Sequence, residues 1–450
     1  MILGIGWSNP DSPSPNLNRE VIMTEITRRS FLKSTGAGLA AASAFTIGAP
    51  KGQAGPNDRV RVATIGLGGQ GRRHAVTVSK FPDCEVVAVC DVDPERREKA
   101  ASELPNSDKV RQLEDFRRAL DDREIDAVTI ATPDHWHAPV ALAALQAGKH
   151  VYVEKPCSHN VRESEWLAEA AEKTGLCVQH GTQSRSGQGI IESMAALREG
   201  LIGKVRLAKA INHQLREPIG RAPDSDPPPG VNYDLWLGPA PQRPFSKNRW
   251  HYNWHWHWDY GTGDIGNDGI HQVDVARWGL GRQLPKAVSA SGGQLFYDDD
   301  HETPDTQIVT FEYDDCYLLF EMRLWTDYPL EGHDNGVVFY GDKGTLEVGR
   351  KGCILTLIGE EPRTIGQGSD FEANFRNFID CLKVGDPSKL NAPIREGAHS
   401  ATLCHLGNIA TRVGRKLHLD PETRTCKGDD EANRLLAREY RKGYEPPEIT

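Results

Sequence analysis

Apolar residues in the first half of the chain cluster in short runs that are separated by helix-forming segments. The runs have the length of single strands and lie at Val60–Ile65, Cys84–Asp91, Ala127–Ala131 and His150–Val153. Runs with few polar positions are typical of strands buried on both faces of a parallel sheet. Helices are predicted at Gln70–Phe81 and Pro139–Ala147, and this alternation favours a doubly wound parallel sheet with right-handed crossovers.

A different pattern begins after residue 285, where short β-rich runs are separated by turns. The runs lie at Ala287–Gly292, Gln307–Tyr313, Tyr317–Leu324, Gly336–Tyr340, Gly344–Val348 and Cys353–Ile358. They predict the strands of one meandering sheet. Two helices are predicted after them, at Phe371–Val384 and Glu396–Gly414.

The turn after the first predicted strand carries spaced glycines. The segment VRVATIGLGGQG contains the pattern G-x-G-x-x-G, formed by Gly66, Gly68 and Gly71. In dinucleotide-binding units these glycines permit a tight turn, close approach of the pyrophosphate and close packing of helix on strand. Gly69 adds backbone freedom, and free N–H groups from Gln70 onward would face the phosphates.

An acidic residue stands at the distance that a dinucleotide site requires. The second predicted strand ends at Asp91, 20 residues after Gly71. A carboxylate there bonds the ribose hydroxyls and disfavours a 2′-phosphate, so NAD is favoured over NADP. Arg96 and Arg97 follow closely and leave NADP open.

The turn after the third predicted strand is a second part of the expected cofactor site. Thr132 and Pro133 follow that strand at its carboxyl end. Doubly wound sheets bind their ligands at this edge. We therefore expect Thr132, Pro133 and the nearby His137 to line the cofactor site.

Four segments together resemble the Gfo/Idh/MocA family, named for glucose–fructose oxidoreductase, inositol dehydrogenase and a rhizopine-catabolism protein. They are GLGGQG, ATPDHWH ending at His137, AGKHVYVEKP ending at Pro156, and GTGDIGNDGIHQVD from Gly261 to Asp274. The segment LCHLGNIATRVGRKL, Leu403–Leu417, resembles exported members. The resemblance implies an α/β fold: an N-terminal Rossmann domain, placed at residues 57–182, and a C-terminal α/β domain with a large, mostly antiparallel open sheet, placed at residues 183–450.

The resemblance also implies roles for single residues. Lys155 is expected near the nicotinamide and the substrate, Glu154 near the nicotinamide ribose, and His271 is expected to be the acid/base residue. Dehydrogenase members carry Asp four residues before this His, but the chain has Asn267 there. Because an amide cannot take up a proton, a relay through this position is in doubt, and the nearby carboxylates that could replace it are Asp264, Asp268 and Asp274.

These residue types match the needs of alcohol oxidation. The reaction requires an oxidant, a base for the hydroxyl proton and a positive group beside the developing alkoxide. NAD is the expected oxidant, and His271 is a suitable base because the unperturbed pKa of histidine is about 6.5. Lys155 is the expected cation. The alternative for Lys155 is a solvated lysine on a loop. The alternative for His271 is a histidine that makes only structural hydrogen bonds.

The segment Trp250–Gly263 is unusually rich in aromatic side chains. Its sequence, WHYNWHWHWDYGTG, holds four tryptophans, three histidines and two tyrosines. Aromatic faces stack on the C–H faces of sugars while polar edges meet hydroxyls, so we expect a carbohydrate pocket that uses Trp254, Trp256 and His257. One alternative is a subunit contact or packed loop, and another is a metal site formed by His251, His255 and His257. We expect no bound metal.

Further polar residues are candidates for the substrate side. Gln183 and Arg185 lie in the segment GTQSRS at a strand end, and Asp268 lies beside Asn267. Arg185 fits a surface position equally well. The proline-rich stretch 217–244 is expected to be irregular, either as a surface loop or as a lid or subunit arm over the pocket.

The N-terminal region predicts export. The motif TRRSFLK, Thr27–Lys33, is followed by an Ala/Gly-rich apolar stretch, with cleavage expected after Ala54. This pattern is typical of a twin-arginine signal peptide, and the apolar run is short for a membrane span. We expect residues 1–56 to be signal and linker, translation to start at Met23, and the mature protein to be periplasmic or otherwise exported.

Export bears on function because no partner that reoxidises NADH is expected outside the cytoplasm. We therefore expect tightly bound NAD and a hydride that returns within each turnover. The leading interpretation is an NAD(P)-dependent oxidoreductase that acts on a secondary hydroxyl of a sugar, polyol or glycoside. The alternatives are a redox-neutral glycoside-cleaving enzyme or epimerase, and a non-catalytic NAD- or sugar-binding protein.

Composition limits the remaining classes. The formal net charge is −10 and no basic tract is present, which argues against a nucleic-acid partner. The nine cysteines include no C-x-x-C pair, so neither a metal cluster nor a disulfide framework is expected. We expect a homo-oligomer formed through the open sheet, and a small carbohydrate as the substrate.

Overall fold

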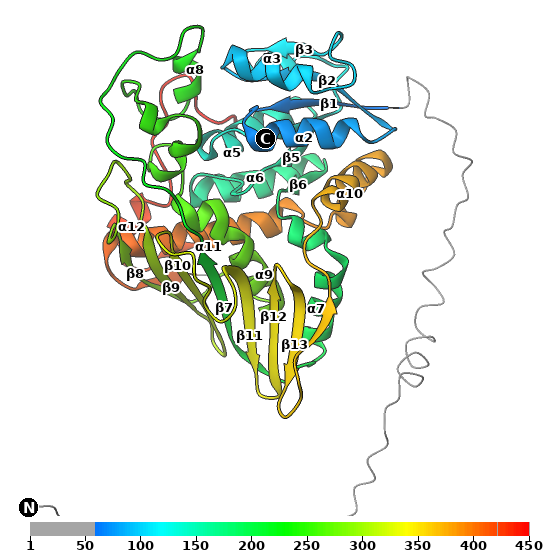
Figure 1. Cartoon of the computed structure of the whole chain (residues 1–450). Helices are drawn as coiled ribbons and strands as arrows, with labels where there is room; N and C mark the ends of the chain where they lie inside the picture. The colour runs from blue at the N-terminus through cyan, green and yellow to red at the C-terminus, as the bar shows by residue number, and fades with distance from the viewer. Residues whose placement is uncertain (1–58, 421, 450) are drawn as a thin grey trace, which may run out of the picture. The chain divides into compact units, whose positions relative to one another are not determined.

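The computed structural model describes residues 59–420 and 422–449, which form two β-sheets with helices packed on them (Figure 1). The predicted signal at Thr27–Lys33, its cleavage after Ala54 and the alternative start at Met23 lie outside these residues. Within the described part of the chain, no helix has both the length and the apolar character needed to cross a membrane.

The first sheet has six strands in the order β3-β2-β1-β4-β5-β6, all parallel. The strands are β1 Val60–Ile65, β2 Cys84–Cys90, β3 Arg111–Leu113, β4 Ala127–Ile130, β5 His150–Val153 and β6 Val178–His180. The predicted doubly wound parallel sheet is therefore confirmed. Since β1 lies between β2 and β4, the strand order reverses there, and the carboxyl ends of β1 and β4 form the switch point where such sheets bind ligands.

Helices connect these strands, and one of them starts earlier than predicted. They are α2 Gly69–Ser79, α3 Pro94–Ser102, α4 Arg117–Leu120, α5 Asp134–Gln146 and α6 Val161–Thr174. The sequence placed the start of α5 at Pro139, but Pro139 lies inside the helix. Proline is unfavourable there; tertiary contacts of the first turn compensate, because Asp134 accepts a hydrogen bond from Thr262 and Trp136 donates to the carbonyl of Trp236.

The second sheet has ten strands in the order β14-β13-β12-β11-β7-β10-β9-β8-β15-β16. They are β7 Val205–His213, β8 Ala287–Gly293, β9 Thr306–Glu312, β10 Tyr317–Arg323, β11 Asn335–Gly341, β12 Gly344–Gly349, β13 Gly352–Leu357, β14 Arg363–Gly366, β15 Leu417–Asp420 and β16 Thr425–Cys426. Only β7 and β10 pair in parallel, so the expected large, mostly antiparallel open sheet is confirmed. The central strand β7 was not predicted, because charged residues such as Lys209 interrupt its apolar pattern.

Helices cover one face of the second sheet (Figure 1). These are α7 Gln188–Arg198, α9 Ile270–Leu280 and α11 Ile394–Val413. On the other face, Ile308 and Tyr317 are exposed. The remaining elements are α8 Tyr233–Leu237, α10 Phe371–Val384 and α12 Asp430–Arg434, the short turns η2 Gln183–Ser186, η3 Lys247–Arg249, η4 His251–Trp256 and η6 Pro387–Lys389, and the π-helical turn η5 Ile265–Gly269.

The two sheets share one apolar core. A single cluster of buried side chains includes Ile65 of β1, Leu145 of α5, Ile270 of α9 and Val309 of β9. All nine cysteines are buried and unpaired. The shared core therefore packs elements of the first sheet directly against elements of the second.

Candidate active site

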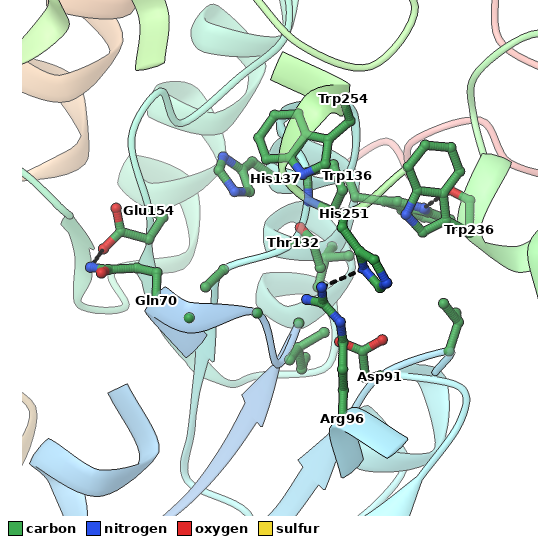
Figure 2. Close-up of a pocket in the computed structure, with 18 of the residues that line it drawn as sticks. Gln70, Asp91, Arg96, Thr132, Trp136, His137, Glu154, Trp236, His251 and Trp254 are labelled. Carbon is green, nitrogen blue, oxygen red and sulfur yellow. Dashed lines mark hydrogen bonds between the residues drawn. The ribbon is translucent and has the colours of Figure 1, made fainter. Parts of the chain in front are cut away.

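A cavity of about 490 Å³ lies at the carboxyl ends of β1 and β4 (Figure 2). Its walls come from the glycine-rich turn, the ends of β2, β4 and β5, helix α8 and the aromatic segment Trp250–His255. Many residues singled out from the sequence line it: Gly66, Gly68, Gly69, Gln70, Asp91, Thr132, Pro133, His137, Glu154, Lys155, Gln183, Trp254, Asn267 and His271. The fold thus brings together segments that are up to two hundred residues apart.

The glycine-rich turn is shaped for the close approach of a ligand. Gly66 has φ +82°, and a Cβ there would lie 2.6 Å from the carbonyl carbon of Ala131. A Cβ on Gly71 would lie 1.7 Å from the carbonyl oxygen of Gly66. Gly68, at the N-cap of α2, provides no side-chain cap. The free N–H groups of the first turn and the bare backbone together fit a dinucleotide phosphate.

We expect Gly71→Ala to destabilise the protein by about 1–3 kcal/mol or more, because the added methyl group collides with a backbone oxygen that cannot rotate away. Thermal unfolding and dinucleotide binding measure the effect. Gly69→Ala is the matched control, since a Cβ at Gly69 meets no atom within 4 Å. Equal unfolding temperatures for the two variants would contradict the close packing of α2 on β1.

Asp91 already organises the turn. Its Oδ2 accepts a hydrogen bond from the Leu67 N–H at 2.6 Å, and its Oδ1 accepts one from the Asp93 N–H at 3.0 Å. Burial raises the pKa of Asp91, although both backbone donors oppose the shift. The carboxylate lines the cavity next to the glycines, where a ribose with free hydroxyls would be accommodated.

Glu154 is an anion held by several donors. Its Oε1 accepts from Gln70 Nε2 at 2.8 Å and lies 2.9 Å from His74 Nε2, and its Oε2 accepts from the Lys155 N–H at 3.2 Å. Burial alone would raise the pKa of this carboxyl, but the contact with His74 and the charge of Lys155 lower the pKa overall. Glu154 is therefore ionised at the wall of the cavity.

Three buried polar atoms in the cavity wall have no hydrogen-bond partner among the described residues. They are Thr132 Oγ1, His137 Nε2 and His271 Nδ1. His137 uses its other nitrogen on the carbonyl of Pro156, at 2.6 Å, and burial lowers the pKa of His137 to about 4. Buried polar groups are normally paired, and these three exceptions all belong to residues that line the cavity.

Lys155 is fixed by the residue that departs from the family pattern. Its Nζ donates to the backbone carbonyl of Asn267 and, at 3.2 Å, to the side-chain Oδ1 of Asn267. The amide nitrogen of Asn267 donates to Asp264 Oδ1 at 2.8 Å and lies 3.4 Å from the Tyr252 hydroxyl. Of the three carboxylates proposed as replacements, Asp264 is thus connected to Lys155 through one amide.

His271 lies near Lys155 on the first turn of α9, directly after the π-helical turn η5. Burial lowers the pKa of His271, and the positive charge of Lys155 lowers it further. The ring is therefore neutral at pH 7 and can accept a proton. The ammonium group of Lys155 and a neutral imidazole thus line the same cavity.

The aromatic segment forms the opposite wall. Trp254 stacks on His255 with ring centroids 3.6 Å apart, and Tyr252 is exposed at the rim. The histidines that could have bound a metal have separate partners: Arg96 for His251, the Tyr252 carbonyl for His255 and the Asn248 carbonyl for His257. Residues 59–420 and 422–449 contain no cluster of three metal-binding side chains.

The cavity also uses residues that were not singled out from the sequence. Trp136, Trp236, Leu235, Tyr252 and Arg73 line it. Leu235 and Trp236 belong to α8, inside the proline-rich stretch 217–244, so this stretch forms part of the wall. Its composition left open a surface loop or a lid or subunit arm over the pocket and did not predict helix α8, whereas the aromatic enrichment near Trp250 pointed to the neighbouring segment.

Some predicted site residues lie outside the cavity lining. Arg185, expected at the substrate side, is buried, and its guanidinium makes two bonds to Asp274 at 2.8 and 2.9 Å. Trp256 and His257 are buried within the aromatic segment. The remaining two are Gly71, which packs α2 on β1, and Asp268, which bonds Gln214, Arg216 and Asn335. The expectation that Arg185 is a substrate-side residue or a surface residue did not include its buried pairing with Asp274.

Comparison with known proteins gives related matches over both sheets. Residues 60–182 match the family model described as "Oxidoreductase family, NAD-binding Rossmann fold", and residues 221–446 match "Oxidoreductase family, C-terminal alpha/beta domain". A glycosyl hydrolase family 109 protein from Shewanella pealeana is 30% identical over 217 residues, which are 43% of this chain and 47% of the relative. The match thus covers about half of that relative.

Two solved structures share the fold. A WlbA dehydrogenase from Chromobacterium violaceum, in complex with NADH and UDP-GlcNAcA, aligns with a TM-score of 0.64 and 20% identity, over 83% of this chain and 99% of that one. Levoglucosan dehydrogenase, in complex with NADH and levoglucosan, aligns with a TM-score of 0.63 and 18% identity, over 80% and 99%. From the two family matches, at residues 60–182 and 221–446, we conclude that the chain belongs to the Gfo/Idh/MocA oxidoreductase family and carries its NAD-binding Rossmann domain.

Proposed function

We propose that this protein is an NAD-dependent oxidoreductase that acts on a secondary hydroxyl of a carbohydrate. The observation that carries the proposal is the meeting of Lys155, a neutral His271 and the glycine-rich turn in one cavity. The aromatic wall formed by Trp254 and Tyr252 suits the mixed apolar and polar surface of a sugar. Gln183 also lines the cavity and is proposed to bond a substrate hydroxyl.

NAD is the proposed cofactor in preference to NADP. Asp91 lies at the end of β2 beside the glycine-rich turn, and its carboxylate would accept ribose hydroxyls but repel a 2′-phosphate. Gln70, Thr132, His137 and Glu154, which line the cavity, are proposed to hold the nicotinamide half. Bound NAD would supply the two-electron oxidant for the substrate carbon.

The side chains then handle the proton and the charge. His271 is proposed to take the hydroxyl proton of the substrate through its neutral imidazole ring, which lines the cavity. Lys155, held by Asn267, places a positive charge beside the oxygen on which negative charge develops. Asn267 orients the ammonium group but does not exchange protons itself, so the relay that Asp supplies in dehydrogenase members is absent at this position.

A redox-neutral reaction is the second candidate, either cleavage of a glycoside or epimerisation. Two observations favour it: the glycosyl hydrolase family 109 relative and the amide at position 267. Transient oxidation of a hydroxyl acidifies the adjacent C–H, which allows a glycosidic group to leave. Export, which the motif TRRSFLK favours, supports this candidate and tight retention of NAD, since a dinucleotide lost outside the cytoplasm would not be replaced.

Protein purified without added cofactor distinguishes these candidates. We expect mass spectrometry of the denatured protein to find close to one NAD(H) per chain. A panel of sugars and glycosides is then tested for product and for absorbance of reduced nicotinamide. Product without net NADH would support the redox-neutral reaction, and NADH formed in step with product would support a dehydrogenase. Protein that neither retains nor binds NAD and is not stabilised by it would refute the proposed function.

A further inference from the structure

Arg96 and His251 meet at the rim of the cavity from opposite sides. Arg96 belongs to α3, and its guanidinium lies over the glycine-rich turn: a Cβ built on Gly68 would be 3.0 Å from Nη1. His251 is the first residue of η4 in the aromatic segment. Arg96 Nη2 and His251 Nδ1 are in hydrogen-bond contact, and both residues line the cavity, so the contact bridges its two walls (Figure 2).

The backbone holds the His251 ring in this position. His251 has φ +51°, a left-handed conformation that residues with a Cβ rarely adopt. The neighbouring Trp250 lies against the ring, with its Nε1 2.6 Å from His251 Nε2. Such local strain persists only where the surroundings determine it, and here it turns the ring toward Arg96.

The contact can open without disrupting the fold. A neutral imidazole has only one acceptor nitrogen, yet donors from Trp250 and Arg96 face both nitrogens of this ring. His251 is exposed at the rim, but partial desolvation of its ring and the charge of Arg96 lower its pKa to about 4, so the ring is neutral. The side chain of Arg96 is 31% exposed, and among the described residues it forms a salt bridge with Asp93 at 3.6 Å. The ring therefore accepts from Arg96 in one tautomer and from Trp250 in the other, and the Arg96 contact is made only in the first.

We propose that Arg96 and His251 form a clasp across the dinucleotide cavity, which slows release of the bound dinucleotide and opens for exchange. The identity of the ligand rests on the proposed function, and the clasp describes how the protein would retain that ligand. Its Arg96 half brings a positive charge to the bare backbone at Gly68, where a phosphate would approach. Its His251 half makes retention depend on the aromatic segment.

Stopped-flow fluorescence of NADH tests the clasp. The full chain is loaded with NADH and mixed with excess NAD, and the release rate is measured for the wild type, Arg96→Gln, His251→Gly and the double variant. We expect each single variant to release NADH about tenfold faster, since a hydrogen bond to a charged group is worth roughly one such factor or more. Because the two residues act as a pair, the double variant should be no faster than the faster single variant.

The controls separate the clasp from general effects. Glycine adopts the left-handed backbone at position 251 without strain, so His251→Gly removes the ring without a backbone penalty. Arg111→Gln and His418→Ala alter an arginine and a histidine outside the cavity lining and should leave the release rate unchanged. Unfolding temperatures show whether each variant is folded. If Arg96→Gln does not fold, the release rate of His251→Gly alone decides the test.

Two results would overturn the clasp. Release rates equal to wild type in both single variants would show that the contact does not hold the ligand. Multiplied effects in the double variant would show two independent contacts rather than a pair. If the wild type binds no dinucleotide, the clasp and the proposed function are both refuted, whereas tight binding with unchanged variants refutes the clasp alone.

Discussion

Lys155→Met is expected to lower kcat/KM by about a thousandfold while the protein still binds NAD. The methionine fills similar space but removes the charge beside the reacting oxygen. In the wild type, the carbonyl and Oδ1 of Asn267 accept from Lys155 Nζ, and the substitution leaves both without this donor. The glycine-rich turn and Asp91, which are expected to hold most of the dinucleotide, are not altered. Steady-state kinetics with the substrate found in the panel, together with NAD titration, measure both effects.

Lys155→Arg shows which property of the lysine matters. Arginine keeps the positive charge but does not give up its proton near neutral pH. Recovery of activity with arginine would indicate that charge suffices, and continued inactivity would indicate a need for the proton or the geometry of lysine. Near-normal activity of Lys155→Met would exclude Lys155 from the chemistry and remove the main support of the proposed mechanism.

Arg185→Ala is expected to reduce the free energy of unfolding by about 3 kcal/mol or more. Arg185 is 5% exposed and Asp274 is fully buried, and truncation of the arginine leaves the carboxylate with Ser400 as its nearest partner, at 2.7 Å. Arg277, at 3.9 Å, compensates only in part. The loss follows from a buried charge without its partner, so it should appear in chemical and thermal unfolding.

Arg198→Ala is the matched control for this effect. Arg198 ends helix α7, close to Arg185 in sequence, and is exposed, so its removal should change stability by less than about 0.5 kcal/mol. If Arg185→Ala instead left stability unchanged and raised KM, the residue would act at the substrate, as its position in the sequence first suggested.

The parallel sheet and the dinucleotide turn were predictable because each depends on local pattern. Buried strands give apolar runs, and Gly66 and Gly71 occur where backbone geometry admits no side chain. The roles expected for Lys155 and His271 were inferred from the resemblance of their motifs to those of the family. The structure then brought both to one cavity, which no local pattern encodes.

Other features depend on partners distant in sequence. Arg185 pairs with Asp274, 89 residues away, so its burial could not be inferred from its own neighbours. The wall formed by Leu235 and Trp236 depends on Trp136, which donates to both of their carbonyls from α5. Strand β7 is stabilised by pairing with β10 and β11 on either side, which outweighs its mixed composition.

The apolar core that runs without interruption from β1 to β9 has a consequence for motion. Many dinucleotide enzymes close by a hinge between two bodies, and such a rotation would here shear a packed interior. Conformational adjustment to a ligand is therefore expected in surface segments, above all at the rim formed by the exposed residues His251 and Tyr252. For the same reason, the two sheets should lose their structure in one cooperative transition rather than as separate folding units.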